Sequence, residues 1–84
     1  DRVCYQRGER IGTLSLKIED MYDAYIKFNG QITDSNMLKQ FNPKIYDPKQ
    51  GGHGCHCSLL FLFLQKLKLG GDWISTYPLK IKIY

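Results

Sequence analysis

The stretch that decides the fold is residues 55–69, CHCSLLFLFLQKLKL, which holds the longest apolar run in the chain. With a helical period, its large side chains fall into one stripe. With a period of two, both of its faces are apolar, which suits a central strand covered on both sides. The glycines just before it and the alternating end at residues 66–69 favour the strand. We therefore predict a central strand here.

Alternation elsewhere in the chain predicts further strands. Apolar residues alternate with polar ones over residues 14–18, 24–28 and 79–84. Asn29-Gly30 tolerates positive φ at both positions, so it predicts a tight turn from the second strand into a short return strand at residues 31–33.

One short helix is expected at residues 34–41, where Asp34 or Ser35 can cap the first turn. It should stop before Pro43, because a residue that precedes proline avoids the α region. Residues 44–46 read as a short extended piece. The predicted fold is mainly β: a small antiparallel sandwich or open barrel-like sheet with one short helix. Its predicted core is Leu14, Leu16, Ile18, Ile26, Phe28, Leu59, Phe61, Phe63, Ile81 and Ile83.

Length and charge bound the function. The 84 residues form one small domain, 1–84, which begins at Asp1 as a processed chain or a fragment of a larger protein would. No apolar run reaches the ~18–20 residues that span a bilayer. The formal charge is +4: residues 1–42 carry six basic and six acidic side chains, residues 43–84 six basic and two acidic. This excess suits an anionic partner, and it is too small to indicate nucleic-acid binding.

The three cysteines predict a staple, which a chain of this size usually needs. Cys55 and Cys57 are too close in sequence for an unstrained bridge. A disulfide from Cys4 to one of them closes a loop of about 50 residues and stabilises the fold by about 4 kcal/mol. The third thiol is then free or bonded to another chain. Disulfides predict an extracellular, secreted protein.

The same cluster allows two other chemistries. His53, Cys55, His56 and Cys57, with Cys4, are residue types that bind zinc, although their spacing differs from that of zinc knuckles. A thiolate beside an imidazole could also act as a nucleophile, but no third orienting group is evident. We predict that the protein is not an enzyme and needs no cofactor, with zinc as an alternative. Glu19, Asp20 and Asp23 would offer oxygen ligands to calcium if they lie in a loop.

Basic and aromatic residues of the second half predict the binding surface. Alternation places Lys66 with Lys68, and Lys80 with Lys82 and Tyr84, on common strand faces, and Trp73 could anchor a partner. The predicted function is a non-enzymatic secreted binding module that engages an anionic membrane surface or a protein partner. The alternative is a disulfide-linked subunit or metal-stabilised structural protein that uses residues 53–57.

The chain also resembles a C2 domain of the type found in perforin-like proteins. The matching pieces, in the order of that family, are Cys4, Arg7-Gly8, residues 14–18, residues 23–28 with Gly30-Gln31, Asn42-Pro43 and residues 78–84. The resemblance implies an eight-stranded antiparallel sandwich that docks on phospholipid, often through calcium. It also implies that Asp23 stands at a calcium-ligand position, with Asp20 as its neighbour.

Overall fold

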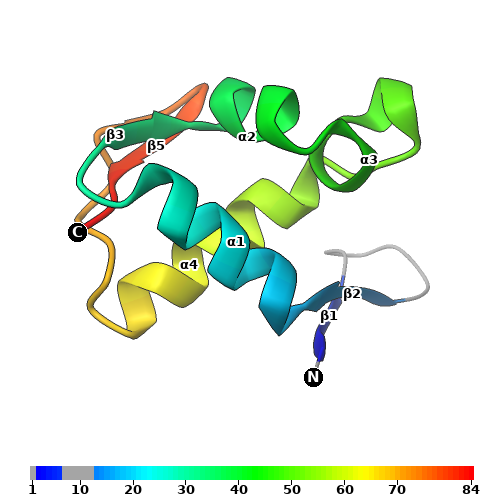
Figure 1. Ribbon diagram of the computed structural model, residues 1–84, viewed down its shortest axis with the longest axis horizontal. Coiled ribbons are helices and arrows are strands. Elements are labelled where there is room, and N and C mark those ends of the chain that lie inside the picture. Colours follow the sequence, from blue (N-terminus) through cyan, green and yellow to red (C-terminus); the bar gives the residue numbers. More distant parts are fainter. Residues whose placement is uncertain (1, 7–12) are drawn as a thin grey trace.

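The fold is a mixture of helices and short strands (Figure 1). The computed structural model describes residues 2–6 and 13–84. The elements are β1 (Arg2–Gln6), β2 (Thr13–Lys17), α1 (Ile18–Phe28), β3 (Ile32–Asp34), α2 (Ser35–Phe41), α3 (Pro43–Tyr46), the 3-10 turn η1 (Pro48–Gln50), α4 (Cys55–Lys66), β4 (Ser75–Thr76) and β5 (Leu79–Lys82). Helical residues outnumber strand residues among those described. The predicted mainly β sandwich or barrel-like sheet is therefore wrong.

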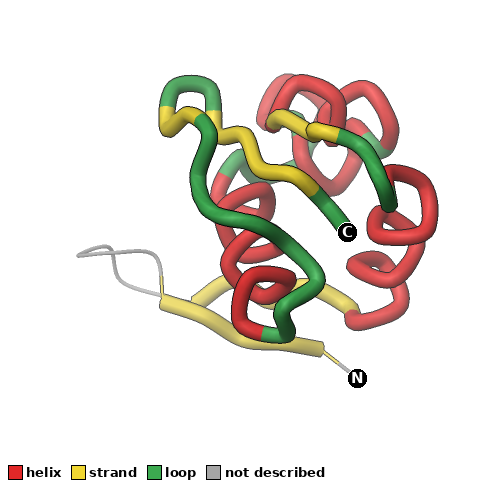
Figure 2. Tube along the Cα trace, turned by 90° about the vertical axis from the view of Figure 1, so that its left-hand side faces the viewer, coloured by secondary structure: helices red, strands yellow, loops and turns green. Residues whose placement is uncertain are grey.

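The strands form two small sheets at opposite ends of the molecule, with α1 and α4 between them (Figures 1 and 2). β1 and β2 make an antiparallel pair, and the second sheet has the antiparallel order β3-β5-β4. Its centre is β5, the last strand in the sequence, so the two ends of the segment 32–82 close on each other. This confirms the strands predicted at residues 31–33 and at the C-terminal end.

The central strand predicted over residues 55–69 is instead α4, a helix of 12 residues. Its most buried side chains are Cys57, Leu60, Phe61 and Leu64, which recur at intervals of three and four. Leu62, which a strand would place with Leu60, is 53% exposed. Leucine is a strong helix former and the segment lacks β-branched residues. Residues 59–64 are all apolar because one face of α4 is buried in the core and the exposed side also carries a leucine, Leu62.

The strand predicted over residues 24–28 is the second half of α1. Met21, Ala24 and Phe28 are buried at helical spacing, and Ile26 is 51% exposed. Three alternating apolar positions were too few to distinguish a strand from a helix, because Ala24 and Phe28 are four residues apart and share a face in both structures. The Asn29-Gly30 turn is confirmed in part: Gly30 has a φ of +82° and leads into β3, but the turn follows a helix.

The predicted helix at residues 34–41 is confirmed as α2. Asp34 caps it, because its carboxylate accepts a hydrogen bond of 2.9 Å from the Met37 backbone N–H. Residues 44–46, predicted to be extended, belong to the helical turn α3.

The core lies among α1, α2, α3, α4 and the inner face of β5. Of the predicted core, Leu16, Phe28, Phe61, Ile81 and Ile83 are buried, and Leu59 and Phe63 are partly buried. Ile18 and Ile26 are exposed on α1, so these two predictions are wrong, and the side chain of Leu14 lies outside the described residues. Leu38 and Tyr46 are fully buried without having been predicted.

A matched pair of leucines tests the helix over 55–66. Leu60→Ala should lower the free energy of unfolding by about 3–5 kcal/mol, because Leu60 is fully buried. Leu62→Ala should change it by only about 0.5 kcal/mol, because the side chain is half exposed. Urea denaturation measures both. Similar losses at the two positions would contradict the helix, since a strand places these leucines on one face.

Candidate functional site

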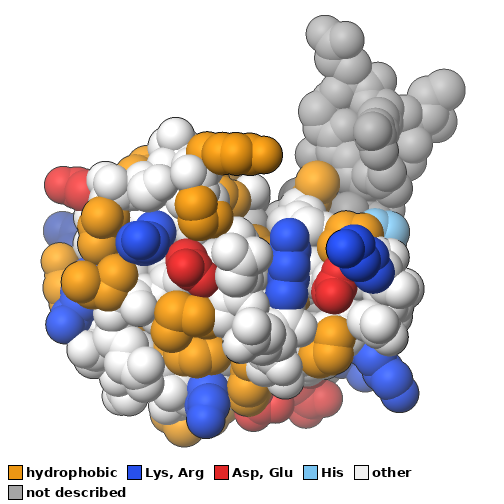
Figure 3. Space-filling model, turned by 90° about the horizontal axis from the view of Figure 1, so that it is seen from above, with side chains coloured by type: hydrophobic (Ala, Val, Ile, Leu, Met, Phe, Trp, Pro, Cys, Tyr) orange, Lys and Arg blue, Asp and Glu red, His pale blue; other side chains and the backbone are white. Residues whose placement is uncertain are grey.

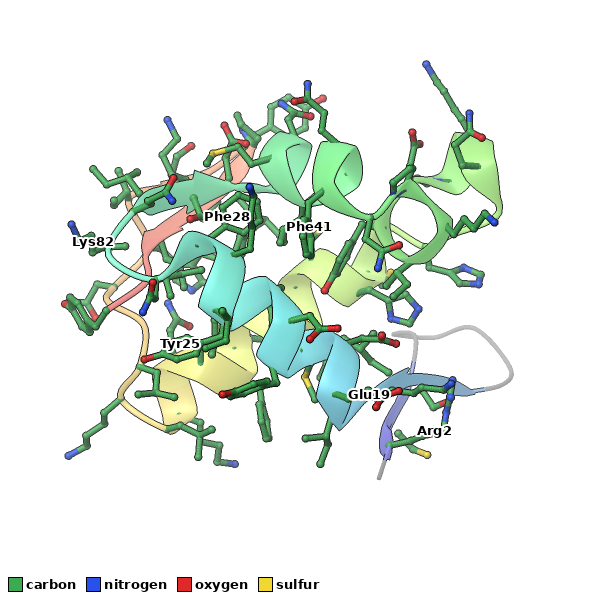
Figure 4. All side chains as sticks on the ribbon, viewed as in Figure 1. Arg2, Glu19, Tyr25, Phe28, Phe41 and Lys82 are labelled. Atoms are coloured by element: carbon green, nitrogen blue, oxygen red, sulfur yellow. The ribbon has the colours of Figure 1, made fainter. Side chains whose placement is uncertain are left out.

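The outer face of the three-stranded sheet carries two of the predicted partner-binding lysines. Ile81 and Ile83 point into the core, so Lys80 and Lys82 point outward. The residue directly across from Lys82 is the exposed Ile32, and Lys80 lies across from Asp34 on one side and Ser75 on the other. Figure 4 places Lys82 at the opposite end of the molecule from Arg2 and Glu19.

The chain after α4 runs beside the end of β5. Gly71 donates its backbone N–H to the Lys82 carbonyl and Tyr84 donates to the Leu69 carbonyl, each at 2.8 Å. A Cβ on Gly70 would lie 2.8 Å from Ile81 Cδ1, so a larger residue here would require the buried Ile81 side chain to shift. The fold thus brings the segment with Lys66 and Lys68 to the strand with Lys82 and Tyr84. We call the surface formed by Lys66, Leu67, Lys68, Lys80, Lys82, Tyr84 and Ile32 the basic corner.

Lys68 has an unusual backbone. Its φ is +62°, in the left-handed region that favours glycine. The Leu69 N–H donates to the Leu64 carbonyl at 2.8 Å, and the Lys68 N–H donates to the Gln65 carbonyl at 3.0 Å. These two bonds form a Schellman motif, in which the left-handed position is usually glycine. A lysine therefore occupies the position that ends α4, at a cost in stability.

Trp73, which is predicted to anchor a partner, is partly covered by the rest of the protein. Its ring lies edge-on to Phe61, with the ring centroids 6.1 Å apart, and it is 36% exposed. It therefore packs partly against the core. The exposed apolar side chains of the basic corner, Ile32 and Leu67, were not predicted as site residues. Ile32 could have been found from the alternation of β3, which sets it opposite to the buried Thr33.

The Cys/His cluster lies at the start of α4. His53 and His56 contact each other edge to face, with ring centroids 5.4 Å apart. His56 and Cys57 are buried, whereas His53 and Cys55 are exposed. The Cys57 thiol faces the Ser35 carbonyl at 4.0 Å. Helical geometry therefore separates Cys55 from Cys57, which a strand would have placed on one side.

The predicted disulfide is absent from the structure. Cys4, on β1, and Cys55 are exposed free thiols, and Cys57 is a buried free thiol. Among the described residues, no group of three or more His, Cys, Asp or Glu side chains is arranged to hold a metal ion. Asp20 and Asp23 lie on the helix α1 and not in a loop. The zinc site and the calcium site therefore stay predictions without a coordinating geometry.

Burial dominates the electrostatics of this region. Desolvation raises the pKa of the Cys57 thiol to about 11, so the thiol is protonated and a poor nucleophile. Desolvation, with the nearby charges of His53 and Arg2, lowers the pKa of His56 below its usual range, against a smaller opposing effect of Asp20. The pKa of Tyr46 is raised, mainly by burial, and its hydroxyl has no hydrogen-bond partner among the residues that the structure describes.

A shallow groove of about 370 Å³ lies elsewhere, between the start of α2 and the turn that joins β4 to β5. It is lined by Ser35, Asn36, Lys39, Thr76, Tyr77, Pro78 and Leu79.

On the face seen from above, lysine and arginine side chains are dispersed among apolar and acidic ones and do not form a continuous patch (Figure 3). No helix of the described part of the chain has the length and apolar character to cross a membrane.

The comparisons with known proteins assign no family. A scan of family models finds no match to the chain, and searches of curated proteins and of solved structures find none either. The C2 resemblance thus stays a prediction, and the eight-stranded sandwich that it implies differs from the observed helices and short sheets.

Thiol labelling tests the placement of the cysteines. Under native, non-reducing conditions, an alkylating reagent should modify Cys4 and Cys55 quickly and Cys57 only after unfolding, because Cys57 is buried and its pKa is about 11. Intact mass should show two labels in the native protein and three in denaturant. Rapid labelling of Cys57, or an unlabelled mass two hydrogens lower, would contradict the structure.

The lowered pKa of His56 predicts a pH dependence of stability. Below the usual histidine pKa of 6.5 the unfolded chain binds a proton that the folded chain does not, so stability should fall as the pH drops through this range. Urea denaturation at pH 7.5 and 5.5 measures the loss, and His56→Gln should reduce it. His53→Gln should retain most of it, because burial is the main cause. Equal stability of the native sequence at both pH values would contradict this account.

Proposed function

We propose that the protein is a non-enzymatic binding module that engages an anionic membrane surface through the basic corner. The observation that carries the proposal is the convergence of two separate segments. The hydrogen bonds from Gly71 to Lys82 and from Tyr84 to Leu69 hold residues 69–71, which directly follow Lys68, beside the end of β5. Exposed apolar side chains, Ile32, Leu67 and Tyr84, lie among these lysines.

The magnitudes fit reversible attachment. A lysine close to an anionic membrane contributes about 1 kcal/mol, so Lys66, Lys68, Lys80 and Lys82 together contribute at most about 4 kcal/mol. Insertion of exposed apolar side chains at the level of the head groups adds to this attraction. Binding of this kind weakens with salt, because charges farther apart than about 8 Å are screened at physiological ionic strength.

The lysines of β5 are expected to contribute unequally. Lys80 lies directly across from Asp34, whose negative charge offsets part of its own. Lys82 lies across from Ile32, which carries no charge and is 55% exposed. Lys82 and Ile32 therefore form the pair best suited to contact both the head groups and the apolar layer beneath them.

The backbone of Lys68 also supports this proposal. A non-glycine residue in a left-handed position costs stability, and such positions are often retained where they serve a function. At Lys68 the side chain adds a positive charge to the basic corner. The exposed positions of α4, Cys55, Leu62 and Lys66, carry only one positive charge, which is a reason to prefer this partner to a nucleic acid.

The structure bears on the three other predictions: a disulfide-linked subunit, a metal-stabilised protein and a secreted location. A disulfide-linked subunit now depends on a bond between chains, for which Cys4 and Cys55 are the exposed thiols. A metal-stabilised protein would need ligands that the described residues do not group together. The secreted location stays a prediction. It was inferred from an internal disulfide, and the three cysteines are free thiols in the structure.

Co-sedimentation with liposomes tests the proposal. The protein should pellet with vesicles rich in phosphatidylserine, pellet less as salt is raised, and stay in solution with phosphatidylcholine alone. Lys80→Glu with Lys82→Glu should weaken binding about tenfold or more, because two positive charges become negative and the net charge falls by four units. The matched control is Lys44→Glu with Lys49→Glu, which changes the net charge equally at exposed sites on α3 and η1.

Three results would contradict the membrane proposal: no binding to anionic vesicles, binding that ignores salt, or equal weakening by the two double variants. Fluorescence anisotropy with duplex DNA provides a further comparison. Tighter binding to DNA than to anionic vesicles at the same salt concentration would also contradict it.

Substitution of Lys68 separates stability from binding. Lys68→Gly should raise the free energy of unfolding by up to about 1 kcal/mol, because glycine adopts a positive φ without steric cost. The same variant should bind anionic vesicles more weakly, since it removes one charge. Loss of stability, or unchanged vesicle affinity at low salt, would contradict the assigned role.

A further inference from the structure

The groove between α2 and the turn that joins β4 to β5 lies at the start of β5, whereas Lys82 and Tyr84 of the basic corner lie at its end. Figure 1 shows the start of α2 beside the chain that leads into β5. Both walls of the groove are anchored to this strand, because Asp34, just before α2, and Ser75 of β4 lie directly across from Lys80 on its two sides. The walls are therefore held in place before any ligand binds.

One wall of the groove is an exposed aromatic side chain. Tyr77 is 97% exposed, so nearly the whole of its ring is open to solvent. Its backbone is fixed on both sides, because its N–H donates to the Ser75 hydroxyl at 3.2 Å and the ring of Pro78 restricts the chain that follows. A single exposed tyrosine is ordinary, but this one stands beside a groove instead of on an open surface. The ring therefore offers a flat apolar face to a ligand in the groove.

The other walls of the groove are mostly polar. Ser35 and Asn36 contribute a hydroxyl and an amide from the first turn of α2, and Thr76 contributes a hydroxyl from β4. Hydroxyls and amides both donate and accept hydrogen bonds, so they suit a ligand with several neutral polar groups. Among the described residues that line the groove, Lys39 alone is charged, and it is half-buried. One cation matches one carboxylate, and it does not balance the several charges of a nucleotide phosphate chain.

A saccharide has the features that these walls would recognise. One face of a sugar ring consists of C–H groups and stacks on an aromatic ring, while the edge of the sugar carries hydroxyls that exchange hydrogen bonds with neutral polar side chains. The groove is shallow, which suits a ligand whose other hydroxyls stay hydrated. A wholly apolar ligand would instead cover the hydroxyls and the amide of the groove without giving them hydrogen bonds. The volume of about 370 Å³ lies within the range of small-molecule sites, about 300–1,000 Å³.

We propose that this groove binds one sugar ring of a saccharide, stacked on Tyr77, and prefers a ring that carries a carboxylate beside Lys39. The site is separate from the proposed membrane attachment and does not depend on it. Its affinity for a single ring is expected in the millimolar range, because a shallow contact leaves little surplus over the cost of immobilising the ligand. A carboxylate should raise the affinity by up to about fivefold, which is the effect of an exposed ion pair.

NMR titration of the ¹⁵N-labelled protein with single sugars tests the proposal. The probes are glucose, galactose, mannose, glucuronic acid and galacturonic acid, each at matched pH and ionic strength and up to about 100 mM, where millimolar binding saturates. Saturable shifts should appear at the amides of residues 35–39, 76 and 77. Glucuronic acid should bind more tightly than glucose, and Lys39→Gln should remove this difference.

Variants of the exposed tyrosine test the stacking. Tyr77→Ala should weaken sugar binding about fivefold or more, because it removes the aromatic face, and Tyr77→Phe should retain it. The matched control is Tyr22→Ala, which removes a tyrosine that is 61% exposed on α1, outside the groove, and should leave the affinity unchanged. Circular dichroism establishes that the variants are folded.

The outcomes distinguish this site from the basic corner. No saturable shift with any of the five sugars would overturn the proposal, as would an affinity equally sensitive to Tyr77→Ala and Tyr22→Ala. A preference for glucuronic acid that is missing, or that persists in Lys39→Gln, would overturn the role of Lys39. Tyr77→Ala should leave binding to phosphatidylserine vesicles unchanged, and loss of vesicle binding in this variant would contradict a separate site.

Discussion

Burial of one side of α4 is the contact on which the rest of the structure depends. Leu60 and Phe61 are fully buried, and Leu64 nearly so, at the centre of a chain too short to form a second core. Gly70 then brings the chain close against Ile81, whose side chain would have to shift to admit a Cβ there. The helix therefore fixes β5 in the sheet, and β5 is the strand that joins β3 to β4.

The position of β5 has direct consequences for the surface. Once Ile81 and Ile83 point into the core, the pleat of the strand turns the half-buried Lys80 and Lys82 to the outer face of the sheet. The same packing draws the residues after α4 alongside the strand, so Lys68 reaches this surface although it is distant in sequence. The basic corner is thus a product of core packing, and a change in the packing of α4 would displace it.

The sequence predicted the polar and capped elements better than the apolar ones. Asp34 identified the start of α2, and the alternation of residues 79–84 identified β5, because each signal fits one structure only. Residues 55–66 were misassigned, since a run that is apolar on every side has no period to measure. The alternation of Ala24, Ile26 and Phe28 misled for a related reason. Ala24 and Phe28 are four residues apart, so they share a face in a helix as well as in a strand.

The outward direction of the β5 lysines was predictable because strand alternation decides it without knowledge of the fold. The state of the cysteines was not predictable, because the disulfide was inferred from the number of cysteines and the small size of the chain alone. Folding of residues 55–57 as the first turn of a helix sends Cys55 outward and Cys57 into the core. Burial of Tyr46 also depends on a contact between α3 and the rest of the core, for which a four-residue helix gives no sequence signal.

The most direct test of this account is the backbone NMR of residues 55–66. A helix packed at the centre of the fold predicts continuous helical Cα chemical shifts across this segment, together with slow amide hydrogen exchange at Leu60, Phe61 and Leu64. Extended-strand shifts across residues 55–66, or rapid exchange at all three amides, would contradict it.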